Sequence, residues 1–220
     1  VDLSNRDLSN AILQGVSLYG ANLSNANLSG ADLSGSSMYH ANLSNANLSG
    51  ADLSHTQIYK AILINTNFTH ANLSYANLCG AHVGEFDFTG ADFSYTDFDH
   101  AYLNNAILKD ATVRHTNFYD STLTKVDLSG KDLTGTILTG ADLSNSILDG
   151  VDLSGKDLTG TILTGADLSN TNLTGIDLSG RYIAGADLSN SILDGVDLSG
   201  KDLTGTKLAG VDLSGKDLTG

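Results

Sequence analysis

The hydrophobic pattern of this chain repeats every five residues. If pentapeptides are counted from Val1, the central position is apolar in every one of them, from Leu3 to Leu218. A period of five gives no apolar face on an α-helix, because successive central residues would be rotated by about 140° around the helix axis. It also breaks the two-residue alternation of an extended strand. We therefore expect a chain that turns a corner once per pentapeptide and directs each central side chain toward one shared axis.

The other four positions support this expectation. The fifth position is Gly in 23 pentapeptides and Asn in nine, and these residues tolerate the positive φ at the third residue of a type II turn. The first position is mostly small, with Ala in 18 pentapeptides, and it is predicted to face a narrow interior. The second and fourth positions are mostly polar and are predicted to face water.

A longer period gives the number of corners in each coil. Residues 21–34 recur letter for letter at 41–54, and Tyr19, Tyr39 and Tyr59 share the same spacing. This shift equals four pentapeptides, which predicts a coil with four corners and 11 coils in the whole chain. At about 4.8 Å between stacked strands, the predicted all-β rod would be about 50 Å long.

The repeated unit also resembles a known family. The pattern A-[DN]-L-[ST]-[GN], as at 31–35, 51–54 and 141–145, resembles that of the pentapeptide-repeat proteins, and the resemblance covers the whole chain. It implies a right-handed quadrilateral parallel β-helix, a solenoid. Because some members bind gyrase as acidic rods, the resemblance also suggests a DNA mimic. Those members typically carry a C-terminal dimerising helix and projecting loops, and this chain has neither pattern.

The sequence divides the single predicted solenoid into two regions. In residues 1–125 the first position is mostly Ala, and in this region 12 fifth positions carry side chains other than Gly or Asn. Five Phe centres and Phe86, at a first position, lie in the same region and predict a wider or differently packed interior. The decorated corners are His40, His55, Lys60, His70, Tyr75, Glu85, Tyr95, His100, Asp110, His115, Asp120 and Lys125.

Residues 126–220 are near-identical tandem repeats. The segment 126–145 recurs at 151–170, a shift of five pentapeptides, and since a coil contains four, the copy is rotated by one face. Basic side chains enter the first position in this region. A buried unpaired Lys is costly, so each is expected either to reach solvent through the corner or to meet an Asp. These residues are Lys131, Lys156, Arg181, Lys201 and Lys216.

Composition and charge exclude several functions. The formal net charge of −14 argues against direct nucleic-acid binding. The sequence contains no apolar run of about 18 residues, so no membrane span is predicted. No signal segment is visible either. The compartment is left open, with the cytoplasm slightly favoured. Cys79 has no neighbouring base, the His residues at corners are spaced too widely for a metal, and a convex rod offers no obvious pocket. We expect no cofactor and no enzymatic activity.

One predicted face collects most of the exposed aromatic and His side chains. Folding the chain at four pentapeptides per coil places two corner columns on either side of a Tyr-rich column. Tyr is enriched at protein interfaces, but stacked Tyr would also stabilise neighbouring coils as cross-strand pairs. The candidate partner-binding residues are Tyr39, His40, His55, Tyr59, Lys60, Tyr75, Tyr95, His115 and Tyr119.

The sequence thus predicts a non-catalytic structural or protein-interaction solenoid. The alternative is an acidic DNA-mimic rod that modulates gyrase, a type II topoisomerase. A second protein is the expected partner, and an end-to-end homodimer is a further possibility because an uncapped solenoid exposes backbone N–H and C=O groups at its ends.

Overall fold

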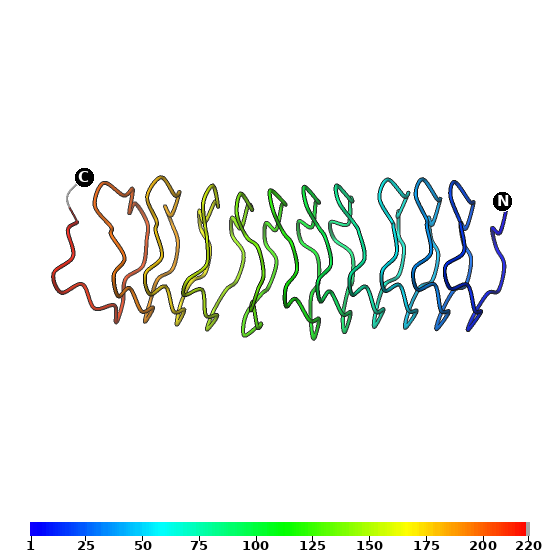
Figure 1. Cartoon of the computed structure of the whole chain (residues 1–220). Helices are drawn as coiled ribbons and strands as arrows, with labels where there is room; N and C mark the ends of the chain where they lie inside the picture. The colour runs from blue at the N-terminus through cyan, green and yellow to red at the C-terminus, as the bar shows by residue number, and fades with distance from the viewer. Residues whose placement is uncertain (219–220) are drawn as a thin grey trace.

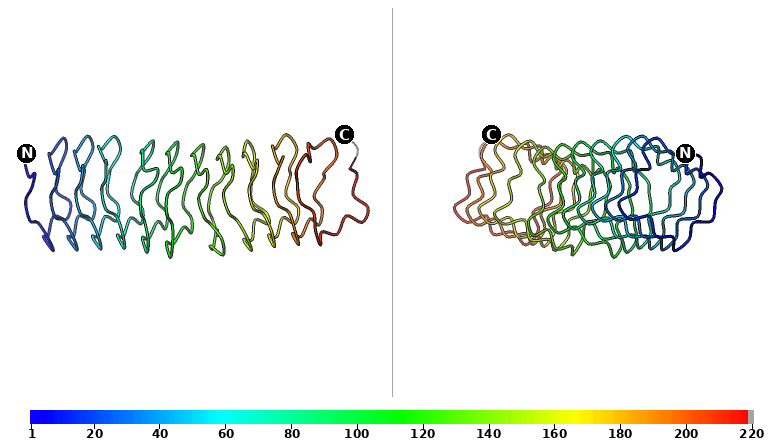
Figure 2. Two further views of the ribbon diagram at one scale, coloured as in Figure 1. Left: turned by 180° about the vertical axis from the view of Figure 1, so that it is seen from behind. Right: turned by 45° about the vertical axis from the view of Figure 1, so that its right-hand side comes forward.

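The computed structural model describes residues 1–218, which form an elongated stack of similar coils (Figure 1). The first and last described residues lie at opposite ends of the rod, and two further views show the same straight stack (Figure 2). The stack continues without interruption past residue 125, where the near-identical tandem repeats begin.

Parallel β-bridges between second positions hold the coils together. Asp2 pairs with Asn22 and Asn22 with Asn42, and the same spacing continues along the rod. In a typical rung, the Leu23 N–H donates to the Asn42 carbonyl at 2.7 Å, and the Asn42 N–H donates to the Ala21 carbonyl at 2.9 Å. Each bridge is a single residue, and no residue of 1–218 lies in a helix or a longer strand. The predicted coil of four pentapeptides is confirmed.

Every described pentapeptide turns at its fifth residue. The φ angles of these residues, from Asn5 to Gly215, lie between 48° and 74°. The following N–H closes the turn on the central carbonyl, as Ala21 does on Leu18 at 2.9 Å. The predicted positive φ is therefore confirmed, and it extends to the decorated corners, where a left-handed conformation costs an L-residue on the order of 1 kcal/mol.

Where the second position is Asp or Asn, its side chain caps the corner. The Asp32 Oδ1 accepts from the Ser34 N–H at 3.0 Å and from the Ser34 Oγ at 2.7 Å, and Asn22 receives the same two bonds from Ser24. This local bonding explains why Asp or Asn precedes the central residue and Ser or Thr follows it. The prediction that both positions are simply exposed is wrong for many pentapeptides, in which they are half-buried between coils.

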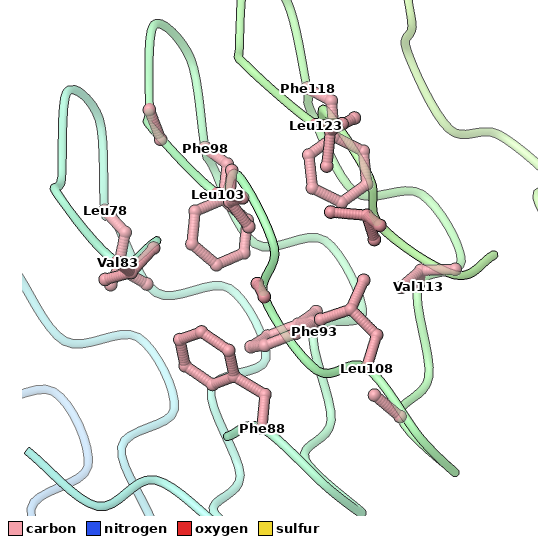
Figure 3. Close-up of a cluster of buried hydrophobic side chains, with 14 of the residues drawn as sticks. Leu78, Val83, Phe88, Phe93, Phe98, Leu103, Leu108, Val113, Phe118 and Leu123 are labelled. Carbon is pink, nitrogen blue, oxygen red and sulfur yellow. The ribbon is translucent and has the colours of Figure 1, made fainter. Parts of the chain in front are cut away.

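The central side chains form one continuous core along the axis. In the Phe-rich segment, the Phe88 and Phe93 rings meet edge to face with centroids 5.0 Å apart, and the Phe98 and Phe118 rings stack at 5.7 Å (Figure 3). These offset and edge arrangements are the favourable geometries of aromatic pairs. The larger Phe rings thus fill the interior in the same register that Leu occupies elsewhere.

The prediction that every central residue is buried is wrong at the two ends. Leu218 is 46% exposed, and six further terminal centres are only partly buried, because each has a coil on one side only. These are Leu3, Leu8, Leu13, Leu203, Leu208 and Leu213.

The size of the first residue decides whether a coil bonds to the one before it. Where this residue is Ala, Ser or Thr, the rung forms, with one exception among the described residues, Ile62–His82. Rungs are missing where a larger side chain enters, because the narrow interior cannot hold it at the normal spacing. Arg181 is the large residue whose rung, Ile162–Tyr182, still forms. Within 1–218, the large first residues without a rung to the preceding coil include Phe86, Val126, Lys131, Val151, Lys156, Ile176, Val196, Lys201 and Val211.

The inward Lys residues bond to backbone carbonyls of the preceding coil. The Lys156 Nζ donates to the Leu133 carbonyl at 2.5 Å and also contacts the Thr136 carbonyl at 3.4 Å. Neither of the two expected solutions, escape through the corner or an Asp partner, describes this bond. Thr makes the equivalent bond, as Thr161 does to Leu138 at 3.1 Å, but its short side chain leaves the rung intact.

Candidate interaction face

Four aromatic rings from consecutive coils stack at one corner of the rod. His55, Tyr75, Tyr95 and His115 have successive centroid distances of 4.7, 4.6 and 4.5 Å and interplanar angles of 7°, 3° and 1°. We call these residues the ring column. The predicted corner column is therefore present as a continuous stack of nearly parallel rings.

The ring column is bounded by small residues. Gly35 precedes it and Gly135 follows it at the same corner. A Cβ at Gly135 would collide with the His115 ring, so this ring lies over the backbone of the next coil. At this corner, therefore, each ring of the column lies over either the next ring or Gly135.

A second stack runs beside the ring column along the Tyr-rich column. Tyr19, Tyr39 and Tyr59 have centroids 5.6 and 5.5 Å apart and are tilted by 21° and 34°. We call these three residues the tyrosine ladder. The Lys60 Nζ lies 5.0 Å from the Tyr59 centroid, and the hydrogen bond to Tyr39 is the main cause that raises the pKa of Lys60. The His40 ring meets Tyr39 edge on at 4.3 Å.

The tyrosine ladder does not extend to Tyr119. Cys79 and Asp99 interrupt the column, with 3.9 Å between the Cys79 Sγ and an Asp99 carboxylate oxygen. Tyr119 instead makes a tilted contact with His100 at 5.9 Å. Burial and the nearby Asp99 raise the pKa of Cys79, which disfavours the thiolate that a nucleophile needs. Tyr119 therefore belongs to this face but not to the ladder.

The two stacks leave their rings accessible. Tyr75 and Tyr95 are 49% and 46% exposed, and Tyr119 is 41% exposed. His40, His55 and Lys60 are exposed, whereas Tyr39, Tyr59 and His115 are half-buried. Within the described part of the chain, no group of three or more His, Cys, Asp or Glu could hold a metal ion. Partner binding by these nine residues stays a prediction.

Sequence reasoning missed one aromatic pair on the adjacent face. His82 and Tyr102 stack at 4.5 Å with an interplanar angle of 15°, and they also form a backbone bridge. Their spacing of one full coil was the available signal, since it places both residues at the second position of stacked pentapeptides.

The coil, its corner turns and its solvent-facing ring stacks define a β-helical solenoid. Comparison with known proteins identifies which solenoids it resembles. The family model for pentapeptide repeats matches segments that together span most of the chain: 1–35, 36–74, 71–110, 116–155, 148–180 and 183–220. The chain therefore belongs to the pentapeptide-repeat family.

Among solved structures, HetL supports the same assignment. HetL, a pentapeptide-repeat protein involved in heterocyst differentiation regulation in the cyanobacterium Nostoc sp. strain PCC 7120, is 31% identical, with a TM-score of 0.54 over 98% of this chain and 88% of HetL. Full-length QnrB1, a plasmid-mediated fluoroquinolone resistance protein, is 20% identical, with a TM-score of 0.32 over 97% of this chain and 92% of QnrB1.

No curated protein sequence matches the chain. Within residues 1–218, no helix is long and apolar enough to cross a membrane.

Proposed function

We propose that this protein is a non-catalytic binding rod, a right-handed quadrilateral β-helix of 11 coils that contacts a partner protein through the ring column and the tyrosine ladder. The observation that carries the proposal is the placement of costly residues. Tyr75 and Tyr95 adopt φ of 59° and 60° at corners where Gly or Asn would be less strained. Strain of this kind tends to be kept where function needs it.

The surface has the composition of a protein contact but not the full area. Tyr rings give a large contact area with few rotatable bonds. The two ring stacks, from Tyr19 to His115, offer on the order of a few hundred Å², whereas a standard interface covers about 800 Å² per partner. The partner is therefore expected to wrap onto a neighbouring face, where His82 and Tyr102 continue the aromatic surface.

The relative HetL is involved in a regulatory process, and regulation by a rod without a catalytic cleft would operate through contacts with other proteins. The alternative remains a DNA mimic that acts on gyrase. The acidic surface of this chain is not confined to one face, because the capping carboxylates recur at second positions around the coil, as at Asp32, Asp87 and Asp142.

A photo-crosslinking experiment tests the proposal. Benzoylphenylalanine replaces Tyr75 in one variant and Tyr182 in the other, which serves as the matched control because Tyr182 is 69% exposed but lies outside both stacks. In the native host, we expect a crosslinked protein, identified by mass spectrometry, from position 75 alone. Equal products from both positions would contradict the proposed face, and inhibition of DNA supercoiling by purified gyrase would favour the alternative.

We also propose that the ends of the rod stack on one another in a dimer. Val1 and Ile12 are 83% and 84% exposed, and several terminal Leu side chains are only partly buried, so end-to-end contact would cover apolar surface. Light scattering should show a dimer at high protein concentration and a monomer when Ile12 is changed to Lys. A strict monomer at all concentrations would rule out this assembly.

A further inference from the structure

One joint between consecutive coils in the N-terminal region lacks its backbone hydrogen bonds along most of two faces. Between residues 60–68 and 79–87, six expected backbone bonds are missing, whereas bonds on either side are intact: Ile58 to Asn77 at 3.0 Å and His70 to Thr89 at 2.8 Å. The N–H groups of Leu63 and His82 therefore have no backbone partner. We call this joint the open seam, and the coils are visibly farther apart here than at neighbouring joints (Figure 1, cyan to green).

Phe86 accounts for the opening. It occupies the inward first position, where Ala, Ser or Thr normally stands, and its ring packs against Phe68 and Phe88 at 6.4 and 6.0 Å. A side chain of this size cannot enter the narrow interior while the coils keep their normal spacing. The Phe86 ring remains only partly buried and holds the two lips of the seam apart.

The open seam contains a groove of about 690 Å³. Ile62 and Ile64, on its wall, are 48% and 62% exposed, and Phe86 lies on the opposite side. A concave surface of this size, with apolar walls and a few polar groups, has the character of a small-molecule site.

The charge on this groove is opposite to that of the whole protein. His40, Lys60 and His82 line it, and no Asp or Glu does, although the chain has a net charge of −14. A second groove at the joint between 105–114 and 125–132 provides a contrast, because Asp110, Asp127 and Asp132 line it beside its basic residues. A smaller groove at the seam shares Phe86 with the first one, but Glu85 and Asp87 line it. Of these three grooves, the first alone joins apolar walls to a rim without carboxylates.

We propose that the open seam binds a small amphipathic carboxylate. The apolar body would contact Ile62 and Phe86, and the carboxylate would accept hydrogen bonds from the Lys60 ammonium and from backbone N–H groups that the open joint leaves unpaired. A carboxylate forms its strongest hydrogen bonds with charged donors and with backbone N–H groups of this kind. This site borders the proposed partner contact, because Lys60 lies against Tyr59 and His40 contacts Tyr39.

The probe is phenylbutyrate, with phenylbutanol as its uncharged analogue, followed by NMR of the Ile methyl groups. We expect phenylbutyrate to shift Ile62 and Ile64 and to bind at least about tenfold more tightly than phenylbutanol, as a charged hydrogen bond implies. Lys60→Gln should weaken phenylbutyrate binding about tenfold. Lys125→Gln, at another corner with positive φ, should leave the affinity unchanged.

A second variant tests the origin of the groove. Phe86→Ala restores the small residue typical of the first position, so the seam should close, amide exchange at Leu63 and His82 should slow, and phenylbutyrate binding should be lost. Equal affinity for the two probes, or unchanged phenylbutyrate binding in Lys60→Gln, would overturn the proposal. The Lys60 result decides the question even if Phe86→Ala fails to fold.

Discussion

The two regions of the rod share a core but differ in how their coils are joined. Leu48 in the first region and Leu158 in the second are both buried, at 0% and 2% exposure. Residues 1–125 form rungs at every joint except the open seam, whereas residues 126–218 lack rungs at many joints. The central Leu therefore defines the axis, and the small first residue determines whether adjacent backbones bond.

The same two regions also differ in the residues at their corners. Side chains other than Asn that are strained at positive φ occur only in residues 1–125, where the ladder is mostly closed. In the second region Gly and Asn turn the corners and larger residues enter the interior. Where the coils are joined by a nearly complete set of backbone rungs, the corners carry residues that are strained at positive φ. Where many rungs are missing, the corners carry Gly or Asn, which adopt positive φ at the lowest cost.

Removing a central side chain should have the largest effect and should differ between joints. Leu143 lies in a pentapeptide with rungs on both sides, whereas neither rung forms around Leu158. Leu143→Ala should lower the free energy of unfolding by about 2–5 kcal/mol through the cavity it leaves. Leu158→Ala should cost less, because a joint without rungs can collapse further into the cavity.

Urea unfolding of both variants, followed by circular dichroism, would measure the difference. Leu218→Ala is the control, since this side chain is already 46% exposed and its loss should have little effect. An equal cost for Leu143 and Leu158 would show that the rungs do not limit relaxation.

Exchanging first residues between the regions should move the rungs. Ala101→Val should break the His82–Tyr102 bridge and destabilise the protein by about 1–3 kcal/mol through overpacking. Lys156→Thr should allow an Ile137–Asp157 bridge and stabilise the protein by about 1 kcal/mol, because burial, which lowers the pKa of Lys156, would no longer oppose its charge.

Amide hydrogen exchange at Asp157 and Tyr102 would report directly whether these two bridges are formed. Exchange should slow at Asp157 in Lys156→Thr and accelerate at Tyr102 in Ala101→Val. Unchanged exchange in both variants would refute the rule that the size of the first residue controls the joint.

Acid should weaken the second region before the first. Bonds from Ser or Thr lower the pKa of capping carboxylates such as Asp132 and Asp157, and a bond from Lys207 is the main cause that lowers the pKa of Asp187 to about 2. A lowered folded pKa means that the stabilisation is present above the unfolded value near 3.9 and is lost as the pH falls toward 2. Many caps of the first region are Asn, which does not titrate.

Hydrogen exchange at pH 3 and pH 6, corrected for the intrinsic rate, would map this difference along the rod. Asp187→Asn keeps the capping oxygen and should reduce the local acid sensitivity. Uniform acid protection over both regions would indicate that relief of the net negative charge outweighs the loss of the caps.

The smallest expected effect concerns the ring column. In Tyr75→Asn, relief of strain at φ of 59° should offset the lost stacking, so the free energy of unfolding should change by less than about 1 kcal/mol. Thermal unfolding would measure this change, with Asn65→Tyr as the reciprocal variant at an undecorated corner. A loss well above this value would show that the rings mainly stabilise the coils.

The period, the corners and the alignment of the ring column followed from the sequence, because a repeat of four pentapeptides fixes which side chains stack. The bonds of the second position did not, since Asp32 is polar whether it faces water or caps a turn. The hydrogen-bond partners of Lys131 and Lys156 could not be predicted from the sequence either. Hydrophobic pattern identifies an inward position, but the backbone carbonyls that accept from it are known only once the preceding coil is placed.

The open seam shows a further limit. Phe86 was noted as an unusual first residue that predicted a differently packed interior, but its consequence depends on how far two coils separate. The separation of two neighbouring coils cannot be derived from the sequence pattern.

The copying of the second region in units of five pentapeptides has a mechanical consequence. The joint opened by Lys131 lies one face before the joint opened by Lys156, and Lys201 opens a joint on the next face again. Missing rungs therefore wind around the axis instead of lining up on one side. A rod with all its weak joints on one face would fold like a hinge, whereas this one should yield slightly and equally in every direction under load.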